Sequence, residues 1–143
     1  METKQGELLQ IVRKTGVYGV RSIRQLLPSV CHTALREKIE HHAVMYQTMA
    51  KKAERMLYDR GILPRELCAC QKMMQWVSIK MNTLKKQDTA SIAKMMVLGC
   101  TMGLIEMHAV LNHQEQKDEE GEQLCQELMQ NERDMIESMA QYL

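Results

Sequence analysis

Apolar and small residues recur every three or four positions along most of this chain, a spacing typical of amphipathic helices. Pro28, Gly61 and the polar stretch QEQKDEEGEQ after His113 interrupt the pattern, and these residue types end helices or favour turns. We therefore expect five helices and no strand. The predicted helices cover residues 4–27, about 33–60, a shorter piece within 62–87, 88–113 and about 119–142. The predicted breaks lie near residues 28–32, 61–64, 86–88 and 114–119.

The same periodicity predicts which side chains face the core. In the second helix the inward positions are Leu35, Ile39, His42, Tyr46, Met49, Ala53, Met56 and Leu57. In the last helix they are Leu124, Leu128, Met135, Met139 and Leu143. Polar residues at such positions stand out, because a buried polar group needs a partner.

The stretch from residue 88 to 113 carries the clearest signals. The Asp88 carboxylate can accept hydrogen bonds from the free N–H groups of the first turn, near the positive end of the helix dipole. Gly99 and Gly103 lie on the apolar face, and a glycine inside a helix costs roughly 1 kcal/mol relative to alanine. We expect both glycines to allow close packing by a helix or a large side chain, so that leucine at position 103 destabilises the fold.

Three polar residues fall on predicted core faces. Glu106 follows Gly103 by about one turn, and His42 and Tyr46 share a face of the second helix. A buried carboxylate must accept hydrogen bonds, bind a cation or take up a proton. We therefore expect an interior polar site in which Glu106 pairs with His42 beside Tyr46. A structural hydrogen-bonded pair is the simplest interpretation, and a ligand or metal site is the alternative.

Cysteine and methionine are the other candidate ligands. Cys68-x-Cys70, together with Cys31-His32 or Cys100, offers the soft ligands that zinc or copper(I) prefers. A single such pair lacks the second pair of a zinc finger, and buried cysteine commonly packs as a small apolar residue. The 14 methionines fall at core positions, where a flexible thioether fills gaps. We predict no metal site at Cys68 and Cys70, and no cofactor.

Composition agrees with an all-α protein. The 143 residues include two prolines and no phenylalanine, whereas unbranched helix formers are abundant. This length suits a single domain, residues 1–143, that buries about two thirds of its unfolded surface. The longest apolar runs fall short of the roughly 20 residues that cross a bilayer, and five cysteines without dense spacing suit reduced thiols. We expect a cytoplasmic protein without membrane contact.

Charge is distributed unevenly, although the net charge is only +1. Residues 1–60 carry 11 basic and 6 acidic groups, whereas residues 115–143 carry 2 basic and 9 acidic ones. Opposite charge at the two ends suggests that the first and last helices face each other or a second copy. A nucleic-acid binder usually has a larger basic stripe with aromatic residues for stacking, and this chain has only Trp76 and four tyrosines. We expect no nucleic-acid binding.

Three features resemble small, uncharacterised bacterial bundle proteins of the ferritin-like superfamily, over nearly the whole chain. They are the first hairpin broken at Leu26-Leu27-Pro28, the crossover segment MQWVSIKMNTL at residues 74–84, and Gly99-x-Thr-Met-Gly103 followed by Ile105-Glu106-Met107. The resemblance implies an all-α, ferritin-like up-down-down-up four-helix bundle with a short helix in the crossover. It implies no particular activity.

The superfamily's iron chemistry can be tested on the sequence. A ferritin-type di-iron site needs a glutamate from each of two helices and Glu-x-x-His from each of the other two. This chain contains no Glu-x-x-His. We therefore expect no stoichiometric iron and neither oxidase nor iron-storage activity.

Functional motifs are otherwise absent from the sequence, which has no glycine-rich loop after a strand and no nucleophile elbow. We therefore favour a non-enzymatic helical-bundle protein that acts through self-association or a protein partner. The alternative is a small-molecule or metal binding module that uses the interior polar site around Glu106 and His42. An enzyme or metal carrier that uses the thiols or the interior polar residues is the third class.

Overall fold

The computed structural model describes residues 6–67 and 88–143. Within these ranges the chain forms four α-helices and no strand, which confirms the all-α prediction there. The α-helices are α1 (Glu7–Leu26), α2 (Thr33–Asp59), α4 (Thr89–Asn112) and α5 (Glu119–Met139), and the 3-10 turns are η1 (Leu27–Ser29) and η2 (Ala140–Tyr142). The predicted crossover helix, with Cys68, Cys70 and Trp76, lies outside the described residues.

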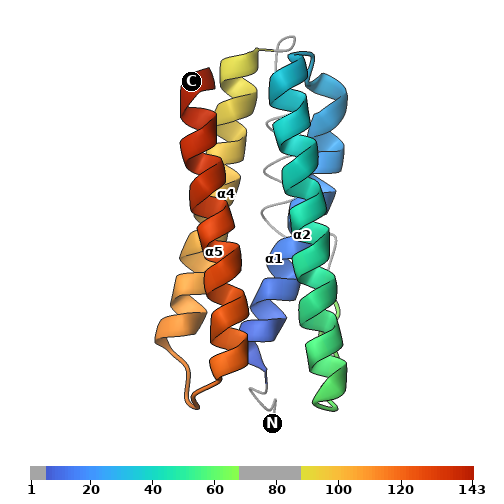
Figure 1. Ribbon diagram of the computed structural model, residues 1–143, viewed down its shortest axis with the longest axis vertical. Helices are drawn as coiled ribbons and strands as arrows, with labels where there is room; N and C mark the ends of the chain where they lie inside the picture. The colour runs from blue at the N-terminus through green and yellow to red at the C-terminus, as the bar shows by residue number, and fades with distance from the viewer. Residues whose placement is uncertain (1–5, 68–87) are drawn as a thin grey trace.

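The four α-helices lie side by side as a bundle (Figure 1). In that view α1 and α5 run upward, whereas α2 and α4 run downward. Each of the pairs α1–α2 and α4–α5 packs as an antiparallel hairpin, and further contacts join α1 to α4, α1 to α5 and α2 to α5. The helices therefore enclose one shared core.

Local capping chemistry sets the helix ends. Asp88 Oδ1 accepts a hydrogen bond from the Ala90 amide at 3.1 Å, which confirms the predicted start of α4. At the end of α2, Gly61 has a φ of 71°, a left-handed conformation that glycine adopts easily. The Ile62 amide then donates to the Leu57 carbonyl at 2.9 Å, so Gly61 ends the helix as predicted.

The core is built from apolar side chains of all four helices. Seven methionines of the described residues are buried in it, as the sequence predicts: Met49, Met95, Met96, Met107, Met129, Met135 and Met139. Leu143 was also expected to face inward, but it is exposed. The reason is that the chain leaves α5 through the tighter turn η2, which changes the helical phase.

The connection after α2 begins without regular secondary structure. The sequence predicts a short helix within residues 62–87, but residues 62–67 are not helical. Gln10 on α1 holds this segment, because its Nε2 donates to the Leu63 carbonyl and its Oε1 accepts from the Arg65 amide, each at 3.1 Å. These bonds direct the backbone along α1 instead of into a helical turn.

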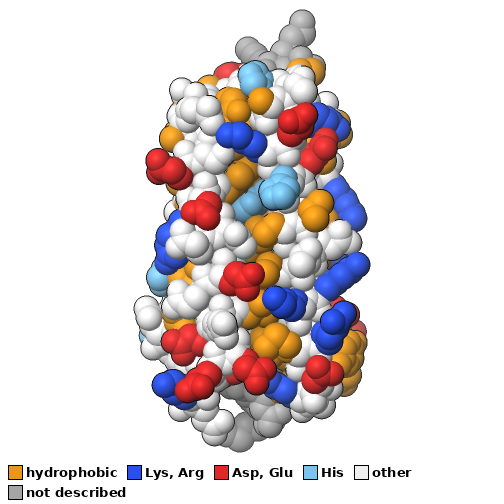
Figure 2. All heavy atoms as spheres, in the orientation of Figure 1, with side chains coloured by type: hydrophobic (Ala, Val, Ile, Leu, Met, Phe, Trp, Pro, Cys, Tyr) orange, Lys and Arg blue, Asp and Glu red, His pale blue; other side chains and the backbone are white. Residues whose placement is uncertain are grey.

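On the visible face of the bundle, charged side chains of both signs are scattered, and apolar side chains gather in the seam between α2 and α5 (Figure 2). One described helix, α4, is long and apolar enough to cross a membrane by length and composition, with a mean hydropathy of 1.4. Core helices of soluble proteins meet the same test, and α4 packs against α1 and α5.

Candidate functional site

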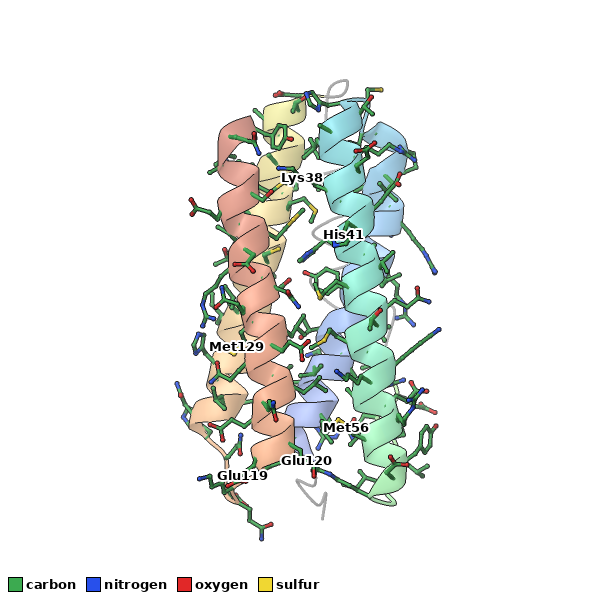
Figure 3. The ribbon with its side chains drawn as sticks, in the orientation of Figure 1. Lys38, His41, Met56, Glu119, Glu120 and Met129 are labelled. Carbon is green, nitrogen blue, oxygen red and sulfur yellow. The ribbon has the colours of Figure 1, made fainter. Side chains whose placement is uncertain are left out.

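Helix α2 brings two polar side chains into the core, one helical turn apart. His42 and Tyr46 are both buried, because residues four apart share one face of a helix. Their rings pack edge to face, with centroids 4.4 Å apart. The neighbouring residue His41 lies on the exposed side of α2 (Figure 3).

A carboxylate from α5 meets both of these side chains. Glu132 is completely buried, at 0% exposure. Because an ionised carboxylate only accepts hydrogen bonds, His42 donates through Nε2 to Oε1, at 2.9 Å. The Tyr46 hydroxyl donates to Oε2, also at 2.9 Å. An unpaired buried carboxylate costs several kcal/mol, so these two bonds offset the burial of Glu132.

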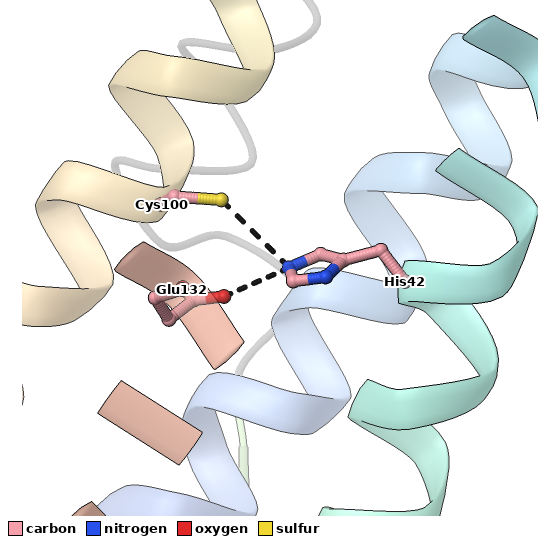
Figure 4. A group of neighbouring side chains, drawn as sticks. All are labelled: His42, Cys100 and Glu132. Carbon is pink, nitrogen blue, oxygen red and sulfur yellow. Dashed lines mark hydrogen bonds and ion pairs between the residues drawn. The ribbon is translucent and has the colours of Figure 1, made fainter. Parts of the chain in front are cut away.

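Helix α4 adds a sulfur atom to this pair. Cys100 Sγ lies 3.8 Å from His42 Nε2 and 3.9 Å from the Tyr46 hydroxyl oxygen. Figure 4 shows His42, Cys100 and Glu132 approaching one another from three different helices. One imidazole nitrogen, one thiol sulfur and one carboxylate oxygen lie within 4.8 Å of one another. These three residues, with Tyr46 beside them, form the candidate site.

The surroundings keep two of these groups neutral. Burial raises the pKa of the Cys100 thiol well above its ordinary value, and the neighbouring Glu132 carboxylate raises it further. Burial likewise raises the pKa of Tyr46, with added contributions from Cys100 and Glu132. Tyr46 therefore keeps its hydroxyl hydrogen at neutral pH and can donate it to Glu132.

Glycines let α1 and α4 approach the site closely. A Cβ atom at Gly19 would lie 2.5 Å from the Tyr46 ring, and one at Gly16 would lie 2.5 Å from the Tyr46 carbonyl oxygen. A Cβ atom at Gly103 would lie 2.8 Å from Glu132 Oε2. Side chains do not approach this closely, so the packing around Tyr46 and Glu132 depends on these three glycines.

Gly99 differs from Gly103. A Cβ atom at Gly99 would have no atom of the described residues within 4 Å. Within the part of the chain that the structure describes, the predicted tight packing at Gly99 is therefore wrong. The physical reason is that Gly99 borders a cavity instead of a neighbouring helix.

That cavity has a volume of about 50 Å³ and is lined mainly by α1 and α4. Tyr46, Cys100 and Glu132 are among its lining residues. The described apolar side chains of the lining are Ile23, Leu26, Met95 and Met96. Thr15 lines it too, and its buried Oγ1 has no hydrogen-bond partner among the described residues. The candidate site therefore borders a partly open pocket that contains an unsatisfied polar group.

Glu106, the expected partner of His42, lies elsewhere. Its side chain is 42% exposed, and its Oε1 lies 3.7 Å from Lys14 Nζ on α1. The predicted Glu106–His42 pair is therefore wrong. The buried positions of this part of α4 are Cys100, Gly103 and Met107, so Glu106 falls just to the side of the buried face.

Two members of the site, Cys100 and Glu132, were not predicted as its residues. The signal for Glu132 was present, because it continues the three-four spacing of the inward residues Leu124, Leu128, Met135 and Met139. Cys100 was considered only as a partner for Cys68 and Cys70. No local motif unites the three ligand atoms, since each comes from a different helix.

Comparison with known proteins bears on the fold. No protein-family model and no curated protein matches this chain. The crystal structure of a conserved hypothetical protein, Rv2844, from Mycobacterium tuberculosis matches with a TM-score of 0.73, and the match covers 100% of both chains. This chain shares that protein's fold. The sequences are only 12% identical, so the likeness supports the helical bundle and assigns no function.

Proposed function

We propose that this protein is a metal-binding helical bundle in which His42, Cys100 and Glu132 hold one divalent transition-metal ion, with zinc as the best match. The observation that carries the proposal is the convergence of three ligand atoms, from three helices, within 4.8 Å. All three side chains are buried, so a bound ion would be shielded from bulk solvent. Metal sites in helical bundles are commonly built this way, from side chains on facing helices.

The ligand types and distances favour zinc. Thiolate and imidazole suit zinc, whereas calcium and magnesium prefer oxygen ligands alone. Zinc–ligand distances of about 2.0–2.3 Å in a tetrahedral site place neighbouring ligand atoms roughly 3.3–3.6 Å apart. The distances from His42 Nε2 to Glu132 Oε1, 2.9 Å, and to Cys100 Sγ, 3.8 Å, lie on either side of that range. Small side-chain rotations would therefore admit the ion.

Charge balance supports the same proposal. A divalent ion would displace the thiol proton of Cys100 to solvent, and the proton on His42 Nε2 would move to Nδ1, because the ion needs the lone pair of Nε2. The Cys100 thiolate and the Glu132 carboxylate would together neutralise the ion. The buried negative charge of Glu132 would then be compensated by the cation in place of the His42 hydrogen bond. Tyr46 can keep its hydrogen bond to Oε2, and a bond of this kind orients a ligating carboxylate.

We further propose that the bundle is ferritin-like. The helix directions in Figure 1, up, down, down and up, support this topology, as does the long connection between α2 and α4. The proposed site differs from a ferritin-type centre, because it has one histidine, one cysteine and one glutamate in place of a carboxylate-rich di-iron set. Self-association, a protein partner and a cytoplasmic location stay predictions from the sequence.

Cobalt(II) titration tests the metal proposal, because cobalt occupies zinc sites and reports thiolate ligation by a charge-transfer absorption band. We expect one cobalt ion per chain in the unaltered protein. Cys100→Ser should lose the band, and Glu132→Gln should weaken binding by about tenfold or more. Cys125→Ser is the matched control, because Cys125 is also buried but its Sγ contacts Met129 Sδ, at 3.8 Å.

Two outcomes would contradict the proposal. In the first, the charge-transfer band persists in Cys100→Ser. In the second, the band disappears when Cys68 and Cys70 are replaced together by serine. In either case the sulfur ligand would be another cysteine.

A further inference from the structure

Three protein ligands leave one position of a tetrahedral ion free. Closed structural zinc sites use four protein ligands, whereas three-ligand sites keep the fourth position for water or another small ligand. Among the described residues, no fourth histidine, cysteine, aspartate or glutamate joins the group of His42, Cys100 and Glu132. The Tyr46 hydroxyl is already hydrogen-bonded to Glu132 Oε2. Within the described residues, the fourth position of the ion is therefore left to water or another small molecule.

The cavity beside the site is the space that such a ligand would enter. Both Cys100 and Glu132 line it, so an ion held by them would border it as well. A single water needs roughly 10–15 Å³ of such space, so about 50 Å³ accommodates a molecule of about four or five non-hydrogen atoms.

Thr15 supplies an independent sign that a ligand belongs in this cavity. Its side chain is only 7% exposed, and its Oγ1 has no hydrogen-bond partner among the described residues. Buried hydroxyl groups are nearly always satisfied, and an unsatisfied one is destabilising. A ligand with a second polar atom, or a water held beside it, would satisfy Thr15.

Charge selects the chemical class of the ligand. A divalent ion with one thiolate and one carboxylate is neutral, so an added anion would place a net negative charge in the core. No lysine or arginine is among the described residues that line the cavity, and much of the lining is apolar, including Ile23, Leu26, Met95 and Met96. A neutral ligand avoids the uncompensated charge.

We infer that the fourth metal position opens into this cavity and binds a small neutral molecule with one nitrogen or oxygen donor and an apolar body, such as an azole or a short alcohol. This inference rests on the proposed metal site. It assigns the cavity between α1 and α4 as the ligand pocket and Thr15 as a positioning residue within it.

The test uses cobalt-loaded protein and two probes, imidazole and azide, at a pH where imidazole is neutral. Imidazole should change the visible cobalt spectrum in a saturable way, whereas azide at the same concentration should not. Azide is the smaller of the two, so size alone cannot exclude it. A response to azide that equals or exceeds the response to imidazole, or no response to either, would overturn the inference.

Two variants separate the pocket from the metal site. Gly99→Leu adds a side chain where no described atom lies within 4 Å, so it should fold, bind cobalt normally and block imidazole. Thr15→Val keeps the shape of the side chain and should weaken imidazole binding by roughly threefold to tenfold, without changing cobalt affinity.

The outcomes also distinguish the two proposals. Failure to bind cobalt contradicts the metal site and this inference together. Normal cobalt binding without a response to imidazole contradicts only the inference. An undiminished imidazole response in Gly99→Leu would show that the ligand does not occupy this cavity.

Discussion

Tyr46 and Glu132 are 86 residues apart in the sequence, and a 2.9 Å hydrogen bond joins them in the buried core. The bond connects α2 to α5 and holds Oε2 of Glu132 against the Tyr46 hydroxyl. Oε1 is thereby left to His42, at 2.9 Å, with Cys100 nearby. The geometry of the candidate site therefore depends on this contact between the two hairpins.

Removal of the tyrosine hydroxyl should destabilise the protein. In Tyr46→Phe, Glu132 Oε2 loses its donor while it stays buried, which should lower the free energy of unfolding by about 1–3 kcal/mol. Urea denaturation measures the change. Tyr58→Phe is the control, because Tyr58 is 56% exposed, and its effect should lie within about 0.5 kcal/mol of zero. Equal effects at the two positions would contradict the importance of the buried bond.

His42 and Glu132 should be energetically coupled, whereas His42 and Glu106 should not. A double-mutant cycle of His42→Leu and Glu132→Gln should give a coupling energy of about 0.5–3 kcal/mol, because the two side chains share a buried hydrogen bond. The matched cycle with Glu106→Gln should give about zero, since Glu106 pairs with Lys14 on a half-exposed face. A larger coupling energy for His42 with Glu106 than for His42 with Glu132 would contradict the structure and support the pair expected from the sequence.

The two glycines of α4 should respond to alanine with opposite signs. Gly103→Ala places a Cβ 2.8 Å from Glu132 Oε2, which is buried and held by the Tyr46 hydroxyl, so overpacking should cost about 1–3 kcal/mol. Gly99→Ala meets no described atom within 4 Å, so the better helix propensity of alanine should stabilise by up to about 1 kcal/mol. Thermal or urea unfolding distinguishes them, and stabilisation by both substitutions would mean that Gly103 has no close neighbour.

Some parts of the fold could be predicted from the sequence, and others could not. Asp88 and Gly61 were placed correctly because a cap depends on a few adjacent residues. The core-facing side of α2 was also predicted correctly, because its apolar residues gather on one face of the helix and most of its polar residues on the other. Leu143 was misplaced because a 3-10 turn at the chain end changes the phase, which the local sequence does not signal.

The site was harder to predict, because α4 is apolar on more than one side. Ile105, for example, is 63% exposed, so the hydrophobic pattern does not fix which face of α4 is buried. Glu106 was assigned to the core for that reason. The correct carboxylate, Glu132, follows a clear inward pattern, but its meeting with His42 and Cys100 depends on how three helices pack.

Acid should weaken the ion pair between Arg60 and Asp118, which joins the end of α2 to the start of α5. The Arg60 hydrogen bonds hold the pKa of Asp118 below its ordinary value, and the Gly121 amide contributes as well. Because the pKa of Asp118 is lower in the folded protein than in the unfolded chain, the pair stabilises the protein above about pH 4. This stability is lost as the pH falls through the pKa that Asp118 has in the folded protein.

Asp118→Asn should therefore lose less stability than the unaltered protein when the pH is lowered, while it keeps the capping oxygen of α5. Urea denaturation at a series of pH values measures the difference. Asp134→Asn, on an exposed part of α5, is the control. Parallel pH profiles for the unaltered protein and Asp118→Asn would show that the pair makes no pH-dependent contribution.

Zinc-edge X-ray absorption on untagged protein, loaded with one equivalent of zinc, tests the central claim most directly. A site made by His42, Cys100 and Glu132 predicts one sulfur ligand at about 2.3 Å, with the remaining nitrogen and oxygen ligands at about 2.0–2.2 Å. A zinc environment with no sulfur, or with two or more sulfur ligands, would contradict it.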